Sequence, residues 1–449
     1  MDTRAIFKAY DVRGTYPDQI NERVCRAVGS AFADFVKTPR VVVARDMRPS
    51  GDSLVEAFSE GARSRGVEVV DIGLASTDLL YFATGFLDAP GAMFTASHNP
   101  AEYNGIKLCL SGARPIGTES GLSEIEAATR TYYDAPATGE LAALVPGDVL
   151  QAWVDHVHSF VDLTRLRSLR IVADTANGMG GFVAPKVFAG LPFEVELMYA
   201  ELDGTFPNHP ADPLNPDNLV DLQARLVESG ADIGLAFDGD ADRVFLIDET
   251  GRPISGSTTT ALVAASLLAK NPGSTILYNV ICSKAVPEII AERGGVGVRT
   301  RVGHSFIKQV MAETNAVFGG EHSGHYYFRD NYRADSGIIT AMLVLEMLST
   351  FEGPLSQMVE PFERYVASGE INTRVNDPAA AVIAVREAVR EHGASIDELD
   401  GLSADYGDWW FNLRPSNTEP LLRLNVEAAS VEECARHTDE VLALVSQLA

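Results

Sequence analysis

Positive charge is scarce in this chain of 449 residues. Lysine and arginine together number 36, against 62 aspartates and glutamates, and the formal net charge is -26. Proteins that bind nucleic acids or anionic membranes need clustered basic side chains. The composition therefore argues against both kinds of partner. A small anionic substrate is still compatible with it, because a few arginines or a metal ion can reverse the potential inside one cleft.

Cysteine and long apolar segments are also scarce. The four cysteines lie far apart, with no C-x-x-C pair and no histidine at zinc-ligand spacing, so we expect reduced core residues. No apolar run approaches the ~18 residues that a membrane span requires. The N-terminal stretch MDTRAIFKAYDVRG contains no apolar segment typical of a secretion signal. We therefore expect a cytoplasmic protein.

Common nucleotide and hydrolase motifs are absent. The chain has no G-x-x-x-x-G-K-[ST] loop, and its glycine-rich stretch NGMGGFV does not match G-x-G-x-x-G. ATP is therefore not the evident source of any phosphate that the protein handles. No G-x-S-x-G elbow surrounds Ser97 either, which argues against a serine protease or esterase.

A strand-like run, a polar turn and a helix-like stretch recur three times, over residues 40–66, 169–190 and 274–294. Each is followed by another short apolar run, and this β-α-β spacing predicts three similar α/β domains with mixed or parallel sheets. The C-terminal part has INTRV, a helix-like segment over 379–392, WWFNL, LLRLNVEA and a final helix from Val431. It predicts a smaller α+β domain whose sheet has one exposed face. The expected domains are residues 1–147, 148–252, 253–367 and 368–449.

Three aspartates, Asp238, Asp240 and Asp242, crowd the stretch FDGDADRVF. The flanking segments are strand-like, so we expect the aspartates on a loop between two strands. If the chain curls there, the carboxylates converge, and their repulsion is acceptable only when a hard cation lies among them. Mg²⁺ held by carboxylates and a substrate phosphate is then the expected ion.

Two other interpretations of the aspartates stay open. In one, their side chains only hydrogen-bond the backbone of a polar turn. In the other, Asp238, Asp240, Asp242 and Glu249 occupy positions one, three, five and twelve of a calcium loop. Position six of such a loop requires glycine, and here it is Arg243.

The stretch AMFTASHNP predicts an apolar strand that ends in polar residues before Pro100 stops further pairing. A serine just beyond a strand end, here Ser97 beside His98, is well placed to carry a covalent group such as phosphate. The same residues are also ordinary turn formers, so a simple turn stays open.

Two later stretches combine polar side chains with glycine or turn residues. In FGGEHSGHYYF, paired glycines lead into Glu321, His322, Ser323 and His325, and Glu321 with Ser323 could bind sugar hydroxyls. In RPSNTEPLLRL, guanidinium groups, hydroxyls and an amide suit a phosphate dianion. The side chains concerned are Arg414, Ser416, Asn417, Thr418 and Arg423. Polar turns are the alternative for both stretches.

Taken together, TASHNP, DGDADR, GEHSGH and RPSNTEP resemble the motifs of the α-D-phosphohexomutase superfamily, in the same order along essentially the whole chain. The GEHSGH form is similar to the phosphomannomutase/phosphoglucomutase branch, because phosphoglucosamine mutases typically have glutamine at the position of His322. Relatives often have glycine at Ala241.

The resemblance implies four domains around a central cleft. Ser97 would be the phosphoserine, with Asp238, Asp240 and Asp242 binding Mg²⁺ together with a phosphoryl oxygen on Ser97. Glu321 and Ser323 would bind the sugar, and the RPSNTEP residues would hold the phosphate that is not being transferred. Further cleft residues would be Arg13, Lys107, Arg243, Lys284, His304 and His325.

The implied reaction interconverts hexose 1-phosphate and hexose 6-phosphate, of mannose, glucose or both, through a hexose 1,6-bisphosphate. Phosphoserine gives its phosphoryl group to the 6-hydroxyl, and the other phosphate then returns to Ser97. His98, Lys107 and His304 are all candidates for the proton acceptor. The alternatives are a phosphoglucosamine mutase, a Mg²⁺-dependent sugar phosphatase and a non-catalytic phosphosugar- or calcium-binding protein.

Overall fold

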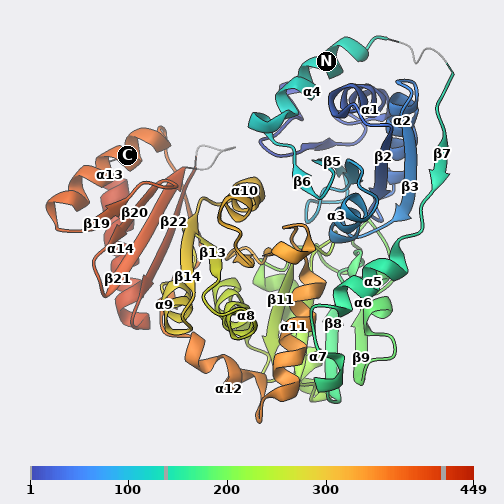
Figure 1. The fold of residues 1–449 in the computed structure, drawn as a ribbon. Helices are drawn as coiled ribbons and strands as arrows, with labels where there is room; N and C mark the ends of the chain where they lie inside the picture. Colours follow the sequence, from blue (N-terminus) through green and yellow to red (C-terminus); the bar gives the residue numbers. More distant parts are fainter. Residues whose placement is uncertain (1–2, 136–139, 416–420, 449) are drawn as a thin grey trace. The chain divides into compact units, whose positions relative to one another are not determined.

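The computed structural model describes residues 3–135, 140–415 and 421–448. The chain forms two compact units, one comprising Met1–Ser255 and Ser323–Met358 and the other Gly256–His322 and Val359–Ala449. The first unit contains two α/β sheets, and the second contains a third α/β sheet and the C-terminal sheet (Figure 1).

The first sheet has the strand order β1-β5-β4-β2-β3-β7, with β6 beside β5. Strands β2, β3, β4 and β7 run parallel, whereas β5 is antiparallel to its neighbours β1, β4 and β6. The β-α-β unit predicted over residues 40–66 is confirmed as β2-α2-β3. The bounds are β1 (Val12–Thr15), β2 (Arg40–Arg45), β3 (Glu68–Leu74), β4 (Gly91–Phe94), β5 (Tyr103–Leu110), β6 (Arg114–Pro115), β7 (Leu144–Pro146), α1 (Glu22–Val36), α2 (Gly51–Arg63), α3 (Thr77–Phe86) and α4 (Leu122–Tyr132).

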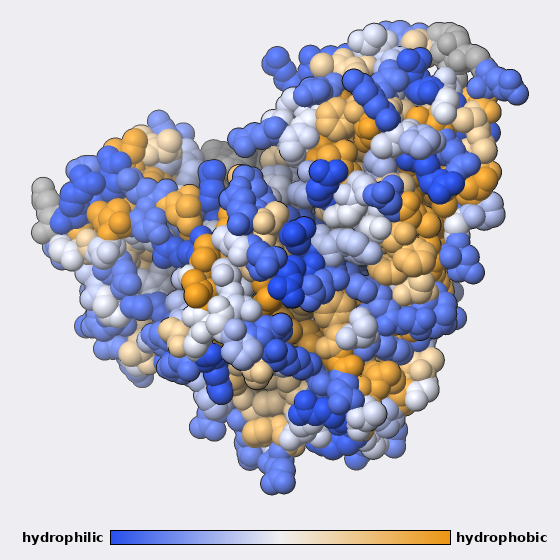
Figure 2. Space-filling model, in the orientation of Figure 1, coloured by the Kyte–Doolittle hydropathy of each residue, from blue (hydrophilic) through white to orange (hydrophobic). Residues whose placement is uncertain are grey.

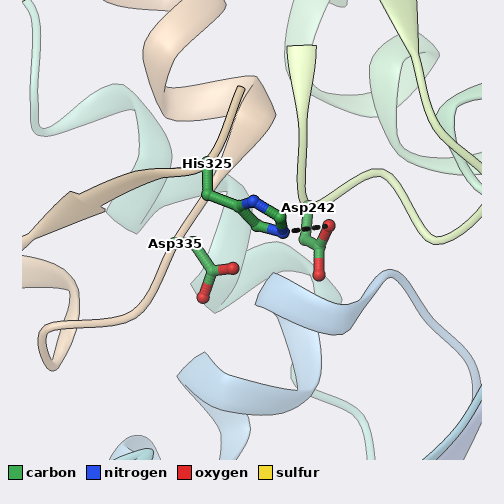
Figure 3. A group of neighbouring side chains, drawn as sticks. All are labelled: Asp242, His325 and Asp335. Atoms are coloured by element: carbon green, nitrogen blue, oxygen red, sulfur yellow. Dashed lines mark ion pairs between the residues drawn. The ribbon is translucent and has the colours of Figure 1, made fainter. Parts of the chain in front are cut away.

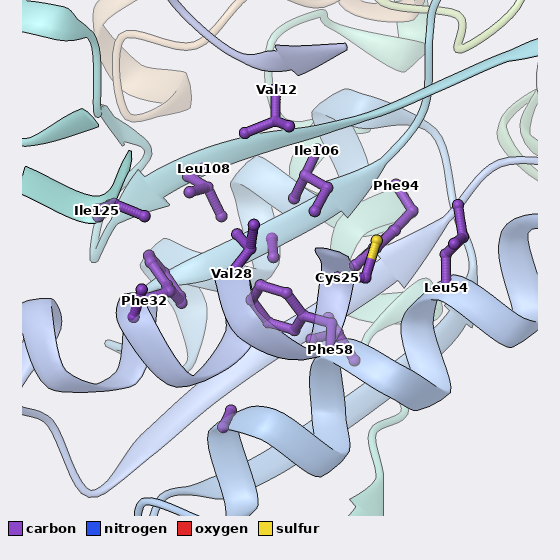
Figure 4. Close-up of a cluster of buried hydrophobic side chains, with 14 of the residues drawn as sticks. Val12, Cys25, Val28, Phe32, Leu54, Phe58, Phe94, Ile106, Leu108 and Ile125 are labelled. Atoms are coloured by element: carbon purple, nitrogen blue, oxygen red, sulfur yellow. The ribbon is translucent and has the colours of Figure 1, made fainter. Parts of the chain in front are cut away.

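Side-chain alternation along β2 builds a core on each face of this sheet. Val41 and Val43 belong to a buried cluster with Phe58 of α2. Figure 4 shows Phe58 in this cluster beside Val28 and Phe32 of α1. Val42 and Ala44 are also fully buried, and they point to the opposite face because successive strand residues alternate. Helix α3 packs against β2 there. With both faces covered, polar side chains at the carboxyl ends of the parallel strands are the ones free to form a site.

The second sheet has the order β12-β11-β10-β8-β9. The predicted repeat over residues 169–190 is confirmed as β8-α6-β9, with parallel strands. Strands β10 and β11 form an antiparallel hairpin in which Phe237 pairs with Val244, so the aspartates lie on a loop between two strands, as predicted. The bounds are β8 (Leu169–Asp174), β9 (Phe193–Met198), β10 (Ile233–Phe237), β11 (Val244–Asp248), β12 (Pro253–Ile254), α5 (Leu150–His158), α6 (Gly180–Phe188), α7 (Val220–Ser229), α11 (Gly337–Thr350) and α12 (Leu355–Val359). The first unit also contains β16 (Tyr326–Phe328), which is not a strand of this sheet.

In the second unit, strands β14, β13 and β15 run parallel in that order. The third predicted repeat, over residues 274–294, is confirmed as β13-α9-β14. The bounds are β13 (Thr275–Asn279), β14 (Val296–Thr300), β15 (Phe318–Gly320), α8 (Gly256–Lys270), α9 (Ala285–Glu292) and α10 (His304–Thr314).

The C-terminal sheet has the order β17-β22-β21-β20-β19, with β18 beside β22. Its strands pair antiparallel, and the predicted helices are confirmed as α13 and α14. The bounds are β17 (Val366–Ala367), β18 (Ile371–Arg374), β19 (Ser395–Asp397), β20 (Leu402–Asp405), β21 (Trp409–Pro415), β22 (Leu421–Ala428), α13 (Pro378–Glu391) and α14 (Val431–Leu448).

The prediction that this sheet leaves one face exposed holds only for part of that face, where Asn372, Arg374 and Asp405 are exposed. Helices α13 and α14 cover one face through a cluster that includes Phe411. On the other face Trp410 and Glu427 are buried as well. The Glu427 carboxylate accepts a hydrogen bond from Trp410 Nε1 at 2.8 Å and from the backbone N–H of Lys284 at 2.9 Å. Part of the second face therefore packs against the start of α9, which sequence alternation alone did not show.

No single helix among the described residues is long and apolar enough to cross a membrane, and α11 meets that test only when joined across a bend to Leu355–Phe362. On the face drawn in Figure 2, hydrophilic residues predominate and apolar ones lie among them.

Candidate active site

Ser97 lies on the loop that follows β4, at the carboxyl end of a parallel strand. It is 5% exposed. Its φ of 50° is in the left-handed region, which strains a serine by about 1 kcal/mol. A residue held in such a conformation needs support from its surroundings, and strain of this kind is concentrated at functional sites.

The three aspartates converge. One carboxylate oxygen from each of Asp238, Asp240 and Asp242 lies within 4.8 Å of the others, and all three residues are buried. The turn between them has Ala241 at a φ of 58°. The hydroxyl of Ser97 donates a hydrogen bond of 2.8 Å to Asp238 Oδ2. The serine loop of the first sheet and the aspartate loop of the second therefore meet.

The chain itself supplies cations to this acidic cluster. Lys107 Nζ lies 2.7 Å from a carboxylate oxygen of both Asp240 and Asp242. Arg243 Nε lies 2.9 Å from Asp238 Oδ2. The expectation that only a hard cation could balance the three carboxylates is therefore wrong. Two protein cations, Lys107 and Arg243, contact the three carboxylates, and burial raises the pKa of Asp238 well above its ordinary value.

Burial and these ion pairs shift the protonation of the cluster. Burial lowers the pKa of Lys107, but the charges of Asp240 and Asp242 outweigh it and raise that pKa well above its ordinary value. Burial raises the pKa of Asp240, but the charge of Lys107 and hydrogen bonds from Lys107 and Thr77 bring it below its ordinary value. Lys107 is thus a cation and Asp240 an anion at neutral pH.

Two arginines, Arg243 and Arg13, contact side chains of the serine loop. Arg243 Nη2 donates to His98 Nδ1 at 2.6 Å, and Arg243's charge, with burial, lowers the pKa of His98 to about 2. Arg13 Nη1 donates to the side-chain oxygen of Asn99 at 2.6 Å. A neutral His98 whose Nδ1 already accepts a hydrogen bond is a weak proton acceptor. Lys107 cannot accept a proton while its ammonium group is already protonated.

Asp242 also faces a second group of residues, from the segments around β16. His325 Nε2 lies 3.8 Å from Asp242 Oδ1 (Figure 3). His325 Nδ1 lies 3.1 Å from the hydroxyl of Ser323. Asp335 lies beside Asp242 and His325, with ligand atoms of all three residues within 4.8 Å of one another. The backbone of His325 bridges that of Arg243. The end of the GEHSGH motif therefore reaches the aspartate loop.

The second unit holds the remaining candidates whose side chains are described. Glu321 is 2% exposed, and its Oε1 accepts hydrogen bonds from Asn279 Nδ2 at 3.2 Å and from the backbone of Gly303 at 3.1 Å. Lys284 Nζ donates to Asp405 Oδ1 at 3.1 Å and to the Gly407 carbonyl at 2.7 Å. These contacts border a cavity of about 420 Å³ that Lys284, Arg299 and Trp410 help to line.

Arg414 and Arg423 share one carboxylate in the second unit. Their guanidinium groups lie 2.8 Å and 3.4 Å from oxygens of Glu370. Ser416, Asn417 and Thr418 lie outside the described residues, as does the side chain of His304. The two arginines thus come together as an anion-binding pair would.

Comparison with known proteins identifies the family of this chain. Four family profiles match, described as Phosphoglucomutase/phosphomannomutase alpha/beta/alpha domain I over residues 4–135, domain II over 151–251, domain III over 255–365 and C-terminal domain over 370–444. The chain belongs to the phosphoglucomutase/phosphomannomutase family. It is therefore a phosphohexomutase, and the predicted family and fold class are confirmed.

Relatives match this family member over nearly their full length. A protein of Xanthomonas campestris named Phosphohexose mutases is 42% identical over 95% of both chains. The Phosphomannomutase of Salmonella typhimurium is 38% identical over 98% of this chain and 99% of the relative. A crystal structure of a phosphoglucomutase/phosphomannomutase family protein from Burkholderia thailandensis has a TM-score of 0.91 and 33% identity, covering 100% of this chain and 98% of that one.

The aspartate loop fits the metal on which the family depends. Among the described residues, Asp240 Oδ1 and Asp242 Oδ1 are buried and have no hydrogen-bond partner. Buried carboxylate oxygens normally have one, and a divalent cation with oxygen ligands would satisfy both. Ala241 takes a left-handed conformation between Asp240 and Asp242.

Sequence reasoning missed two residues of this site. Thr77 donates to Asp240 through both its hydroxyl, at 2.5 Å, and its backbone N–H, at 3.0 Å. Arg48 contacts the backbone of the serine loop. A signal for Arg48 was available. Arg48 follows β2, and Ser97 follows β4. These two strands are parallel, and their last residues, Arg45 and Phe94, pair with each other. The loops after these two strands had to be neighbours.

Proposed function

We propose that this phosphohexomutase interconverts the 1-phosphates and 6-phosphates of glucose, mannose or both through a phosphoserine at Ser97 and a hexose 1,6-bisphosphate. The observation that carries the proposal is the hydrogen bond between the Ser97 hydroxyl and Asp238, within the cluster of three buried carboxylates. It brings the residue that would carry the phosphoryl group to the residues that would hold a cation.

Asp238, Asp240 and Asp242 would hold Mg²⁺, and a phosphoryl oxygen on Ser97 would be a further ligand. Bound there, the ion would withdraw charge from the phosphoryl group during transfer. Lys107 and Arg243, which contact these carboxylates, would add positive charge beside the same group. His98 stays neutral and turns its Nδ1 toward Arg243.

The roles of the other candidates follow from their chemistry. Arg13 and His325 would orient the substrate near Ser97. Glu321 and Ser323 would bind sugar hydroxyls, and Lys284 and His304 would bind the substrate as well. The phosphate that is not being transferred would be held by Arg414, Ser416, Asn417, Thr418 and Arg423. A pocket that recognises only phosphate can serve both ends of a reorienting bisphosphate.

We also propose the four domains as residues 1–147, 148–252, 253–367 and 368–449, with one motif in each. The cytoplasm is the proposed compartment, on the ground that all four cysteines are free and buried, as is usual where thiols stay reduced.

The test is turnover with each substrate. Purified protein with Mg²⁺ and a trace of hexose 1,6-bisphosphate is incubated with glucose 1-phosphate and with mannose 1-phosphate, and the 6-phosphates are measured. The ratio of the two kcat/KM values gives the sugar preference. Ser97→Ala is expected to abolish turnover and to remove the phosphate that intact mass detects in the wild type. No 6-phosphate from either sugar would overturn the proposal.

The same assay distinguishes the alternatives. A phosphoglucosamine mutase would turn over glucosamine 1-phosphate faster than either hexose. A sugar phosphatase would release inorganic phosphate in place of the isomer. Binding without chemistry would leave every substrate unchanged.

A further inference from the structure

Arg48 donates hydrogen bonds to the backbone of the loop that carries Ser97. Its Nη2 donates to the carbonyls of Ser97 at 2.8 Å and Asn99 at 2.7 Å, and its Nη1 donates to those of Pro100 and Tyr103, both at 2.8 Å. The residue is 2% exposed. One planar guanidinium thus ties together four carbonyls of a single loop, with Ser97 at one end.

The charge of Arg48 is neutralised locally. Arg48 Nε lies 3.2 Å from Asp46 Oδ2, both side chains are fully buried, and the backbone N–H of Arg48 donates to Asp46 Oδ1 at 3.0 Å. A neutral buried pair exerts little net attraction on a phosphate group. The described polar contacts of Arg48 are with backbone oxygens and Asp46, and its guanidinium carbon lies 5.3 Å from the centroid of the Phe206 ring. Its effect on the reaction must therefore come through the position of the loop.

Thr95 supports the other side of Ser97. Its hydroxyl accepts a hydrogen bond from the backbone N–H of Ser97 at 2.9 Å. The amide N–H of Ser97 is therefore held by Thr95 and its carbonyl by Arg48. This support acts on a residue whose φ of 50° is strained.

We propose that Arg48 is a positioning residue for phosphoryl transfer. It fixes the backbone of Ser97 so that Oγ keeps one position whether or not it carries the phosphoryl group. The reaction needs this, because the same oxygen must first give and then take back a phosphoryl group. The inference rests on the proposed function.

Lysine cannot replace this arginine. Its ammonium group carries the same charge, but its three donors radiate from one atom and cannot reach four carbonyls in a fork. In Arg48→Lys the loop loses contacts while the buried charge is retained. Displacing a reacting group by about 1 Å can cost ~100-fold in rate, so we expect kcat to fall by about 10- to 100-fold. KM for the 1-phosphate should change by less than about 2-fold, because Arg48 does not touch the substrate.

A loosened loop should also lose phosphate to water. In that side reaction a water oxygen bonds to phosphorus, the bond from phosphorus to Ser97 Oγ breaks, and Oγ takes up the proton that water gives. The ratio of inorganic phosphate released to 6-phosphate formed should rise by about 10-fold in Arg48→Lys, in step with the lost positioning. An arginine with only a structural role would lower the amount of folded enzyme without changing this ratio.

The control is Arg45→Lys. Arg45 lies three residues away at the end of β2 and pairs with an aspartate too, with Nε 2.5 Å from Asp52 Oδ1. This ion pair lies outside the serine loop, so kcat, KM and the phosphate ratio should match the wild type.

Thr95 supplies a second test in case Arg48→Lys does not fold. Thr95→Val removes the acceptor of the Ser97 N–H at nearly constant volume, and Thr95→Ser keeps it. The valine variant should show the lower kcat and the raised phosphate ratio, and the serine variant should restore both. Wild-type values of kcat and ratio in both Arg48→Lys and Thr95→Val would overturn the proposal, as would a fall in kcat with an unchanged ratio.

Amide hydrogen exchange separates this inference from the proposed function. In Arg48→Lys, exchange over residues 96–103 should speed up while exchange in α11 stays at the wild-type rate. A wild type without mutase activity would overturn the proposed function and the catalytic part of this inference, and the exchange result would still report whether Arg48 holds the loop. Unchanged exchange at 96–103 in an active enzyme would overturn the positioning role alone.

Discussion

The hydroxyl of Ser97 donates a 2.8 Å hydrogen bond to Asp238, a residue 141 positions later in the chain and in a different sheet. The contact exists because each residue lies on a loop at the carboxyl end of its sheet's parallel strands. Neither loop alone could place the Ser97 hydroxyl against three carboxylates. The predictions that follow test what holds this pair of loops in place.

Replacing Lys107 tests the balance of charge around the aspartates. Lys107→Met removes the cation that contacts both Asp240 and Asp242. Leaving buried carboxylates without their partner costs about 3–5 kcal/mol, so the metal-free variant should melt well below the metal-free wild type. Mg²⁺ should raise its Tm by more than it raises that of the wild type, because the ion replaces the missing charge.

Thermal melting with EDTA and with Mg²⁺ measures both effects. Lys186→Met, on the exposed side of α6, is the control and should melt as the wild type does. Equal Mg²⁺-induced shifts in Lys107→Met and wild type would contradict the prediction.

Gly239 permits the close approach of the two loops. A Cβ added there would lie 2.5 Å from the carbonyl oxygen of Ser97, so Gly239→Ala must push the loops apart. Overpacking of this kind costs about 1–3 kcal/mol, and the displaced serine should lower kcat by at least ~10-fold. Steady-state kinetics and melting check both numbers.

Gly297→Ala on β14 serves as the comparison, because its nearest neighbour would be a Tyr278 ring carbon at 3.3 Å. It should leave kcat unchanged. A Gly239→Ala enzyme with wild-type kcat would show that the loops need not touch.

Asp78 predicts a pH dependence of stability. Burial raises its pKa to about 7, although hydrogen bonds from Ser336 and Ser76 oppose the shift. Because the folded state binds this proton more tightly than the unfolded state does, the stabilisation is complete at low pH and is lost as the pH rises through 7. Asp78→Asn removes the titrating group and keeps the shape.

The Tm of the wild type, measured in EDTA, should therefore fall relative to that of Asp78→Asn between about pH 4 and 7, and the difference should be constant above pH 7. A difference that stays constant over this range would mean that Asp78 is already charged in the folded protein.

Asp405 binds Lys284 and would therefore compete with the substrate for its ammonium group. If Lys284 binds the substrate as proposed, Asp405→Asn should free its ammonium group from the 3.1 Å contact and lower KM. Exposed ion pairs are worth about 0.2–1 kcal/mol, so the expected decrease in KM is about 1.5- to 5-fold. Initial rates at several 1-phosphate concentrations give KM directly.

Asp408→Asn removes an exposed carboxylate nearby and should leave KM unchanged. A KM for Asp405→Asn equal to that of this control would remove Lys284 from the proposed substrate contacts.

The sequence by itself determined the architecture and the chemistry of the loops. The periodicity of apolar residues predicted three β-α-β units and a C-terminal α+β part, and the structure contains all of them. These features are local: strand and helix periodicity, turn residues, and the crowding of Asp238, Asp240 and Asp242 can all be recognised within a few residues. The four motifs also sufficed to indicate the family.

Only the tertiary structure decided which residues compensate the charge of the aspartate loop and which residues support the serine loop. Lys107 lies more than 130 positions from Asp240, and Arg48 reaches carbonyls about 50 positions away, so neither contact leaves a local pattern. The buried part of the second face of the C-terminal sheet was missed for the same reason, since it depends on packing against the start of α9. Periodicity reports which way a side chain points along its own strand or helix, whereas charge compensation and support of a strained loop depend on which distant segments the packed sheets bring together.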